Sequence, residues 1–229
     1  MLANSSQIVL WALEKLIDGE RPEMEAIGKA TSSADALRLA KEKRPDILLL
    51  GLYLGIEKSV DLIPDFVKDE HTRVLIFTEM REPQGTVDRA ILNGASGVVY
   101  KEEPIQNILK AIEKIHGGEL WLNRNTFNRI LMKSLRARGG ASTSYDIGKT
   151  ATLTRKERLI VNAFAIEAGS PNKRIAEILC ISEQTLRNHL TSIFNKLEIG
   201  NRFELFMFAK RHHQPDLTEP SPAFSVSSL

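Results

Sequence analysis

The sequence predicts two domains of different fold class, an α/β domain with a parallel sheet followed by an all-α domain. Apolar runs alternate with helical patterns at the start of the chain, which favours the first prediction. A series of helical patterns after a stretch rich in glycine and serine favours the second. A length of 229 residues suits two modest domains, at roughly 100–200 residues each.

Two continuous apolar runs, 46–50 and 74–78, indicate strands that are covered on both faces of a sheet. Shorter runs at 26–28 and 98–100 predict two further strands. Helical patterns occupy the segments near 5–17, 33–44, 60–67, 86–93 and 105–116. This alternation predicts a parallel sheet with helices on both faces.

The charge of the chain is distributed unevenly. Residues 1–122 hold 15 basic and 20 acidic side chains, and the remaining residues hold 16 and 9. A basic C-terminal half suits a polyanionic partner, although a solvated basic surface gives the same balance. No run approaches the roughly 20 apolar residues of a membrane span. The single cysteine, Cys180, cannot form an internal disulfide, so we expect a core position for it and a reducing, cytoplasmic location for the protein.

Helix start signals divide the C-terminal region into four helices. The signals are a capping box at 154–157, Pro171 after Ser170, and cap residues at 182 and 201. A short helix, a tight turn at 180–181 and a capped helix over 182–197 are typical of a helix-turn-helix. The alternative is a plain four-helix unit with a solvated polar face, because this geometry also occurs in proteins that do not bind DNA.

Polar side chains lie between the core positions of the helix over 182–197. The candidate base-contacting residues are Gln184, Arg187, Asn188 and Thr191. Arginine can make a bidentate contact to guanine, and asparagine to adenine. The candidate phosphate-contacting residues are Lys173, Ser182, Thr185, Lys196 and Arg202.

Several C-terminal segments closely resemble the LuxR-type helix-turn-helix of NarL/FixJ response regulators. They are Leu153–Arg158, Asn172–Ala176, Ile181–Leu190, Ile193–Leu197 and Asn201-Arg202. The resemblance implies binding to double-stranded DNA, with the positions of Arg187, Asn188 and Thr191 facing bases. The last helix of that family, here 202–210, often forms a dimer contact. We therefore expect a homodimer, or else packing of the aromatic residues within one chain; the candidate contact residues are Phe203, Phe206, Met207 and Lys210.

Residues 1–122 resemble the flavodoxin-like receiver domain of the same family. The resemblance is carried by Arg44–Leu50, by Asn93–Gly97 and by Lys101. In a working receiver, an acidic pair after the first strand holds Mg²⁺ and an aspartate that ends the third strand takes the phosphoryl group. A threonine or serine and a lysine then bind this group, and Thr78 and Lys101 retain those two positions.

The resemblance fails at the residues that phosphorylation needs. Gly51 stands at the phosphoacceptor position and has no nucleophile. The first strand and its acidic pair are largely missing, because the chain begins near Leu2-Ala3-Asn4, where we place the start of the first helix. Gly55 and Val98 replace the usual proline and aromatic residue. Without carboxylates Mg²⁺ has little to hold it, so we expect a degenerate receiver that is not phosphorylated.

Two interpretations of Thr78 and Lys101 stay open. They are relic or structural residues, or they belong to a small-ligand or anion site at the carboxyl edge of the sheet. The sequence holds no glycine-rich phosphate loop, no zinc-spaced cluster of cysteine and histidine, and no nucleophile elbow. We therefore expect no enzymatic activity, no cofactor and no metal.

The predicted domains are a degenerate receiver at 1–122, a basic linker helix and flexible linker at 123–151, a DNA-binding domain at 152–213 and a disordered tail at 214–229. The expected function is sequence-specific transcription regulation without aspartyl phosphorylation. RNA polymerase or another regulator are further candidate partners, and we expect no membrane contact. The alternatives are control by a ligand or partner at the former phosphorylation face, and a heterodimerising protein that sequesters a related regulator.

Overall fold

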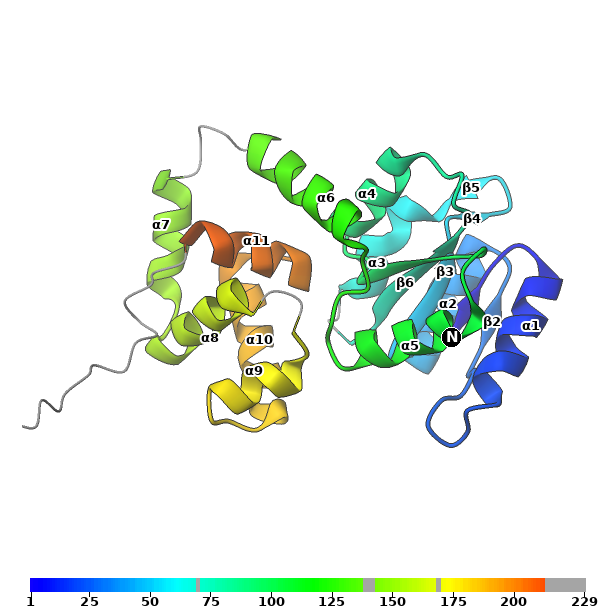
Figure 1. Ribbon diagram of the computed structural model, residues 1–229, viewed down its shortest axis with the longest axis horizontal. Coiled ribbons are helices and arrows are strands. Elements are labelled where there is room, and N and C mark those ends of the chain that lie inside the picture. The colour runs from blue at the N-terminus through cyan, green and yellow to red at the C-terminus, as the bar shows by residue number, and fades with distance from the viewer. Residues whose placement is uncertain (69–70, 138–142, 168–169, 213–229) are drawn as a thin grey trace, which may run out of the picture.

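The computed structural model describes residues 1–68, 71–137, 143–167 and 170–212, which form an α/β domain and a helical domain (Figure 1). A five-stranded sheet with the order β2-β1-β3-β6-β7 lies at the centre of the first domain, and its strand pairs are all parallel. The strands are β1 (Leu2–Ala3), β2 (Lys29–Ala30), β3 (Ile47–Gly51), β6 (Arg73–Thr78) and β7 (Gly97–Tyr100). The predicted fold class is confirmed.

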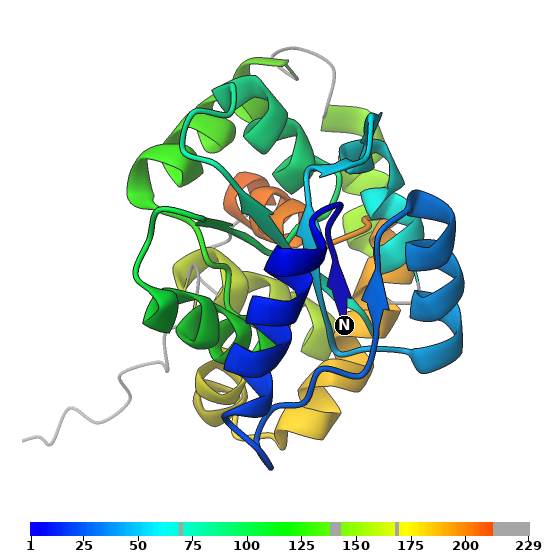
Figure 2. The same cartoon turned by 90° about the vertical axis from the view of Figure 1, so that its right-hand side faces the viewer.

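Helices cover both faces of the sheet, as the apolar runs predict. One face packs against α1 (Gln7–Asp18) and α5 (Ile105–His116). The other packs against α2 (Ser33–Lys43), the 3-10 helix η1 (Ser59–Leu62), α3 (Ile63–Val67) and α4 (Gln84–Leu92). Figure 2 shows α1 and α2 on either side of the first strands. Successive residues of β3 alternate between the two cores, so that Leu49 joins one and Leu48 and Leu50 join the other.

The first strand corrects one sequence expectation. We placed Leu2-Ala3-Asn4 at the start of the first helix, but Leu2 and Ala3 form a short central strand. They pair with Lys29 and Ala30 on one side and with Leu49 and Leu50 on the other. The helix begins only at Gln7, after its cap residue Ser6. Main-chain pairing with two neighbours therefore makes a strand of a segment too short to show a strand pattern.

Other boundaries shift by a few residues. Strand β2 lies at 29–30 rather than at 26–28. A small hairpin of β4 (Tyr53–Leu54) and β5 (Glu57–Lys58) follows β3 and is absent from the sequence prediction. Gly55 has a φ of 71° at its turn, a backbone conformation that glycine adopts without strain. Gly55, which stands where the family usually has a proline, thus lies in a tight turn.

Helices α6 (Arg124–Ala137) and α7 (Thr143–Thr152) connect the two domains (Figure 1). Helix α7 begins inside the predicted flexible linker, whose residues 139–142 lie outside the described part of the chain. The predicted tail at 214–229 also lies outside it. In the described residues, no helix has the length and apolar character needed to cross a membrane.

The helical domain consists of α8 (Arg155–Ile166), α9 (Asn172–Ile178), α10 (Glu183–Leu197) and α11 (Arg202–His212). The capping box predicted at its start is present. The Thr154 hydroxyl accepts from the Glu157 amide, and the Glu157 carboxylate accepts from the Thr154 amide. Asn201 accepts from the amide of Glu204 at the start of α11. These contacts satisfy amides that a helix start leaves unpaired, which explains why the sequence located these helices well.

Candidate nucleic-acid interface

Helix α10 is the predicted recognition helix, and its local structure follows from its sequence. The Ser182 hydroxyl accepts from the amide of Thr185 and caps the helix start. The predicted core stripe is buried and consists of Leu186, Leu190, Ile193 and Leu197. The turn before the helix contains Cys180, which has a φ of 51° and is exposed. The expected core position of Cys180 is wrong, because the tight turn directs this residue outward.

The four candidate base-contacting residues lie on the polar side of α10. The Gln184 amide donates to Asn188 Oδ1 over 3.1 Å, and Arg187 forms an ion pair of 2.8 Å with Glu183. The Thr191 hydroxyl donates to the Arg187 carbonyl oxygen. Gln184, Asn188 and Thr191 are exposed and Arg187 is half-buried. The structure therefore brings this predicted set together as one polar surface.

The candidate phosphate-contacting residues divide into two groups. Lys173 and Ser182 are exposed near the helix-turn-helix start, and Thr185 is half-buried beside them. Lys196 instead donates to both carboxylate oxygens of Glu157, at 2.9 and 2.7 Å. Lys196 thus serves the packing of α10 on α8 in this structure, and its predicted phosphate contact is not available here.

Arg202 likewise points inward, contrary to the surface position that a phosphate contact requires. Its guanidinium donates to Asn172 Oδ1 and to the Ser170 carbonyl oxygen, and it lies 4.4 Å from the ring centre of Phe164. None of these groups is charged. Burial, and then the nearby charge of Arg73, lower the pKa of Arg202, which reflects the cost of placing a cation there.

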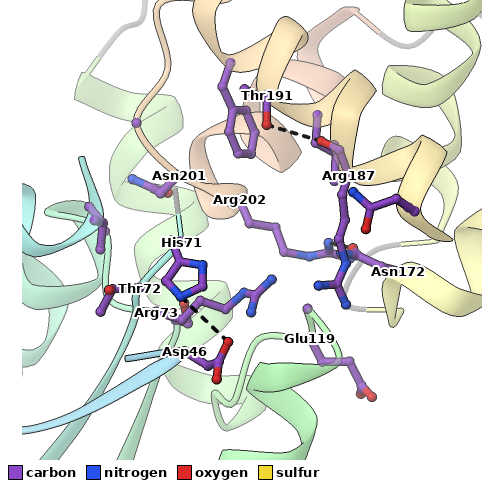
Figure 3. Close-up of a pocket in the computed structure, with 18 residues that line it drawn as sticks. Asp46, His71, Thr72, Arg73, Glu119, Asn172, Arg187, Thr191, Asn201 and Arg202 are labelled. Atoms are coloured by element: carbon purple, nitrogen blue, oxygen red, sulfur yellow. Dashed lines mark hydrogen bonds and ion pairs between the residues drawn. The ribbon is translucent and has the colours of Figure 1, made fainter. Parts of the chain in front are cut away.

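The polar side of α10 faces the α/β domain across a cavity (Figure 3). Gln184, Arg187 and Thr191 line this cavity from the helical domain. The other wall is the amino edge of the sheet, where β3, β6 and β7 begin. Asp46 and Arg73 lie on that wall. The candidate base-contacting surface is therefore turned toward the first domain.

Main-chain and side-chain contacts fix this closed arrangement. The amide of Asn172 donates to the Gly117 carbonyl oxygen over 3.0 Å, which joins α9 to the end of α5. A Cβ on Gly118 would lie 2.7 Å from the Asn172 side chain, and Gly118 has a φ of 86°. Only glycine suits this position, because any side chain would be strained and would collide with the second domain.

The apolar side of α11 also packs against the first domain. Phe203, Phe206 and Met207 join the core that contains α4, and Phe127 of α6 contacts both phenylalanine rings. Lys210 is exposed, with its ammonium 5.8 Å from the Phe206 ring centre. Phe208 belongs to the core of the helical domain. In this structure the apolar part of the predicted dimer surface is thus covered by the first domain of the same chain. This agrees with the alternative expectation, in which the aromatic residues pack within one chain.

A buried carboxylate attaches α6 to α4. Asp88 accepts three hydrogen bonds from Arg129, the shortest of 2.7 Å, and pairs with Lys133 at 3.0 Å. Burial raises the pKa of Asp88, but hydrogen bonds from Arg129 and Lys133 outweigh it and leave that pKa below its ordinary value. Sequence reasoning missed this contact, because nothing in the spacing of residues 88, 129 and 133 connects them.

At the carboxyl edge of the sheet, the end of β3 and the two positions directly after β1 hold no carboxylate. Strand β3 ends at Gly51, and the two residues after β1 are Asn4 and Ser5 rather than carboxylates. A Cβ on Gly51 would lie 2.9 Å from Nδ2 of Asn4, so the buried Asn4 side chain fills the space of the missing aspartate. Asn4 was not recognised from the sequence, because the expected helix start concealed its position after a strand.

Thr78 and Lys101, the two retained residues, both lie at this edge of the sheet. Thr78 ends β6 and is buried, whereas the Lys101 ammonium pairs with Glu79 at 3.1 Å. Within the described ranges, no group of three or more histidine, cysteine, aspartate or glutamate residues could hold a metal ion.

Comparison with known proteins agrees with both halves of this description. Residues 1–113 match the response regulator receiver domain family, and residues 151–209 match the luxR family of bacterial regulatory proteins. The nitrate/nitrite response regulator protein NarL of Escherichia coli (strain K12) is 30% identical over 187 residues, which cover 80% of this chain and 82% of NarL.

Other comparisons cover different shares of the chain. The transcriptional regulatory protein DesR of Bacillus subtilis (strain 168) is 28% identical, with 91% of this chain and 94% of DesR covered. Among solved structures, a LuxR-family two-component response regulator from Aurantimonas sp. SI85-9A1 has a TM-score of 0.52 at 28% identity, over 59% of this chain and 96% of that one.

Proposed function

Because the chain belongs to the LuxR/NarL family of DNA-binding transcriptional response regulators, we propose that it reads specific DNA sites without control by aspartyl phosphorylation. Gly51 carries this proposal. Its hydrogen side chain offers no oxygen for a phosphoryl group, and Asn4 occupies the adjacent space. The second requirement, carboxylates for Mg²⁺, is not met by Asn4 and Ser5, since an amide and a hydroxyl bring no negative charge.

The proposed DNA contact is the polar side of α10 in a major groove. Arg187 and Asn188 would read base edges, and Lys173, Ser182 and Thr185 would contact phosphates. The other expected contacts, Lys196 and Arg202, would require their present intramolecular contacts to break. A recognition helix must enter the groove, so the first domain, which stands across the cavity, has to move before DNA binds.

The proposed assembly on DNA is a dimer on a two-fold site, with α11 as a contact surface. Phe203, Phe206 and Met207 pack on the first domain in this structure. The movement that frees α10 would also free this apolar side of α11, which supports opening and dimerisation as coupled steps. In this proposal, the DNA affinity is set by how far the first domain covers α10, and not by phosphorylation.

Intact-mass spectrometry after incubation with acetyl phosphate and Mg²⁺ tests the phosphorylation claim. We expect no phosphoryl adduct, while a receiver with an intact aspartate, treated alongside, becomes modified. The variant Gly51→Asp is a stricter arm, and we expect it to stay unmodified because Asn4 and Ser5 still cannot hold Mg²⁺. An acid-labile adduct on an aspartate of the wild-type chain would contradict the proposal.

A further inference from the structure

The cavity between the two domains is lined by several charged side chains, among them three arginines. It has a volume of about 330 Å³ and lies at the amino edge of the sheet, opposite the edge that carries Gly51 and Thr78. Small-molecule sites in proteins begin at roughly 300 Å³, so a small metabolite would fit. The cavity is therefore separate from the former phosphorylation face, which lies at the carboxyl edge of the sheet.

Three arginine side chains enter this cavity from different elements. Arg73 comes from β6 of the first domain, Arg187 from α10 and Arg202 from α11. Figure 3 shows their guanidinium groups directed toward one another. Cations of one sign placed together in a partly enclosed space repel, so this arrangement is unfavourable unless an anion is added.

The existing contacts leave this charge incompletely balanced. Within the described residues, the half-buried Arg73 side chain makes no hydrogen bond and no ion pair. Arg202 contacts only uncharged groups, and Arg187 pairs with Glu183 at the cavity wall. Burial, and then the charge of Arg187, lower the pKa of Arg73, although an arginine stays charged near neutral pH.

Two carboxylates that line the cavity do not cancel this charge. Glu119 pairs with Lys114 at 3.0 Å, and Asp46 lies 3.8 Å from the ring nitrogen of His71. Glu119 is thus directed partly to another cation, and Asp46 lies beside the His71 ring. With Glu183 and Lys114 included, four cations stand against three carboxylates, so one positive charge remains without a carboxylate around the cavity.

We propose that this cavity binds the phosphate group of a small anion between Arg73, Arg187 and Arg202. The planar guanidinium presents paired donors that match phosphate oxygens, which makes arginine the residue best suited to this ligand. Such an anion bridges the two domains and stabilises the closed arrangement. It also occupies Arg187, so the bound anion and DNA exclude one another. This last consequence rests on the proposed DNA-binding function, whereas anion binding itself does not.

Thermal unfolding with defined probes tests the site without DNA. Inorganic phosphate and ribose 5-phosphate are titrated at constant ionic strength, with chloride as the reference and sulfate as a second oxyanion. We expect a saturable rise in Tm for the wild-type chain with at least one phosphate probe. The variant Arg73→Gln should bind about tenfold more weakly or worse, because it removes a charge-assisted contact. Arg38→Gln, at an exposed arginine of α2, should behave like the wild type.

The outcomes separate the sources of the ligand. Tighter binding of ribose 5-phosphate indicates an organic phosphate, and equal binding indicates inorganic phosphate; both support the site. No saturable shift beyond chloride, or equal phosphate affinity in Arg73→Gln and wild type, would overturn it. In a second arm, phosphate should weaken DNA binding of the wild type more than that of Arg73→Gln. Failure to find any DNA site would affect the proposed function and leave the first arm intact.

Discussion

The Arg187 side chain cannot face the interdomain cavity and contact DNA at the same time. In the structure it faces the cavity and pairs with Glu183, whereas on DNA its guanidinium would read a base edge. The residue therefore connects the closed arrangement to the proposed DNA contact. Its ion pair with Glu183 is on the same helix and partly exposed, so that pair costs little to exchange for guanine.

The substitution Arg187→Ala should weaken specific DNA binding by about 1–3 kcal/mol and relax the preference at one base position. Footprinting on a selected DNA site measures both effects. The matched control is Lys173→Ala, which should weaken binding uniformly across sequences and reduce the salt slope by about 1. A variant Arg187→Ala that keeps full affinity and full sequence preference would exclude this residue from base contact.

Glu157 holds the start of α8 to α10 through a dense set of contacts. It accepts from Thr154, Lys196 and Ser192, and its side chain is almost fully buried. Burial raises its pKa, but these hydrogen bonds outweigh it and lower the pKa of Glu157 from 4.5 to about 2. A folded-state pKa below the unfolded value stabilises the fold above pH 4.5, and this stability is lost as pH falls toward 2.

Replacing this carboxylate by Glu157→Gln should therefore lower the free energy of unfolding at pH 7 by roughly 2–3 kcal/mol. Denaturant unfolding at several pH values measures the difference between variant and wild type. This difference should narrow as pH falls from 5 to 3, because the wild type loses its advantage there. A difference that is independent of pH would contradict the assignment of the low pKa to Glu157.

Helix α6 depends on one buried carboxylate for its position on α4. Asp88 is 3% exposed and pairs with both Arg129 and Lys133, so loss of its charge takes the shared carboxylate from two cations. We expect Asp88→Asn to lower the free energy of unfolding by roughly 2–4 kcal/mol, because breaking one side of a buried pair is costly. Circular dichroism during thermal unfolding tests this at pH 7.

A matched control for that substitution lies on α2. Asp35→Asn removes a carboxylate that also pairs with an arginine, Arg38, but is about half exposed. Its effect should be much smaller than that of Asp88→Asn, because exposed ion pairs contribute little to stability. Equal effects of the two substitutions would show that burial of Asp88 contributes nothing to the attachment of α6.

The sequence predicted elements best where local chemistry determines them. The capping box at Thr154 and Glu157 and the cap at Ser182 act within one helix turn, so the pattern alone locates them. Strand β1 could not be predicted, because two residues carry no periodicity and Leu2 and Ala3 become a strand only through pairing with β2 and β3. The positions of Lys196 and Arg202 were also beyond prediction, since their partners come from other helices.

At the scale of the whole molecule, the closed arrangement covers both the candidate DNA-contacting side of α10 and the candidate dimer side of α11. The recognition residues were predicted from α10 alone, but their position opposite Arg73 depends on contacts between domains far apart in sequence. Phe127 contributes to these contacts from α6, with its ring centre 6.0 Å from that of Phe203 and 5.3 Å from that of Phe206. It therefore offers a way to open the molecule without changing the DNA-binding domain.

The substitution Phe127→Ala should increase the apparent affinity for DNA. Loss of about 1–2 kcal/mol of interdomain packing raises the fraction of open molecules, and the apparent Kd falls by about 5–30-fold while that fraction is small. Fluorescence anisotropy with a selected DNA site measures this change. Met132→Ala, at an exposed position of the same helix, is the control and should leave the Kd unchanged. If Phe127→Ala binds DNA no more tightly than the wild type, the closed arrangement does not limit access to DNA.

The proposed DNA recognition does not depend on aspartyl phosphorylation. The most direct test is the Kd of the full chain for its selected DNA site, measured with and without acetyl phosphate and Mg²⁺ at the same ionic strength. We expect the same footprint and an unchanged Kd under both conditions. Binding that appears or tightens strongly only with the phosphodonor, together with a phosphoryl adduct on the protein, would contradict it.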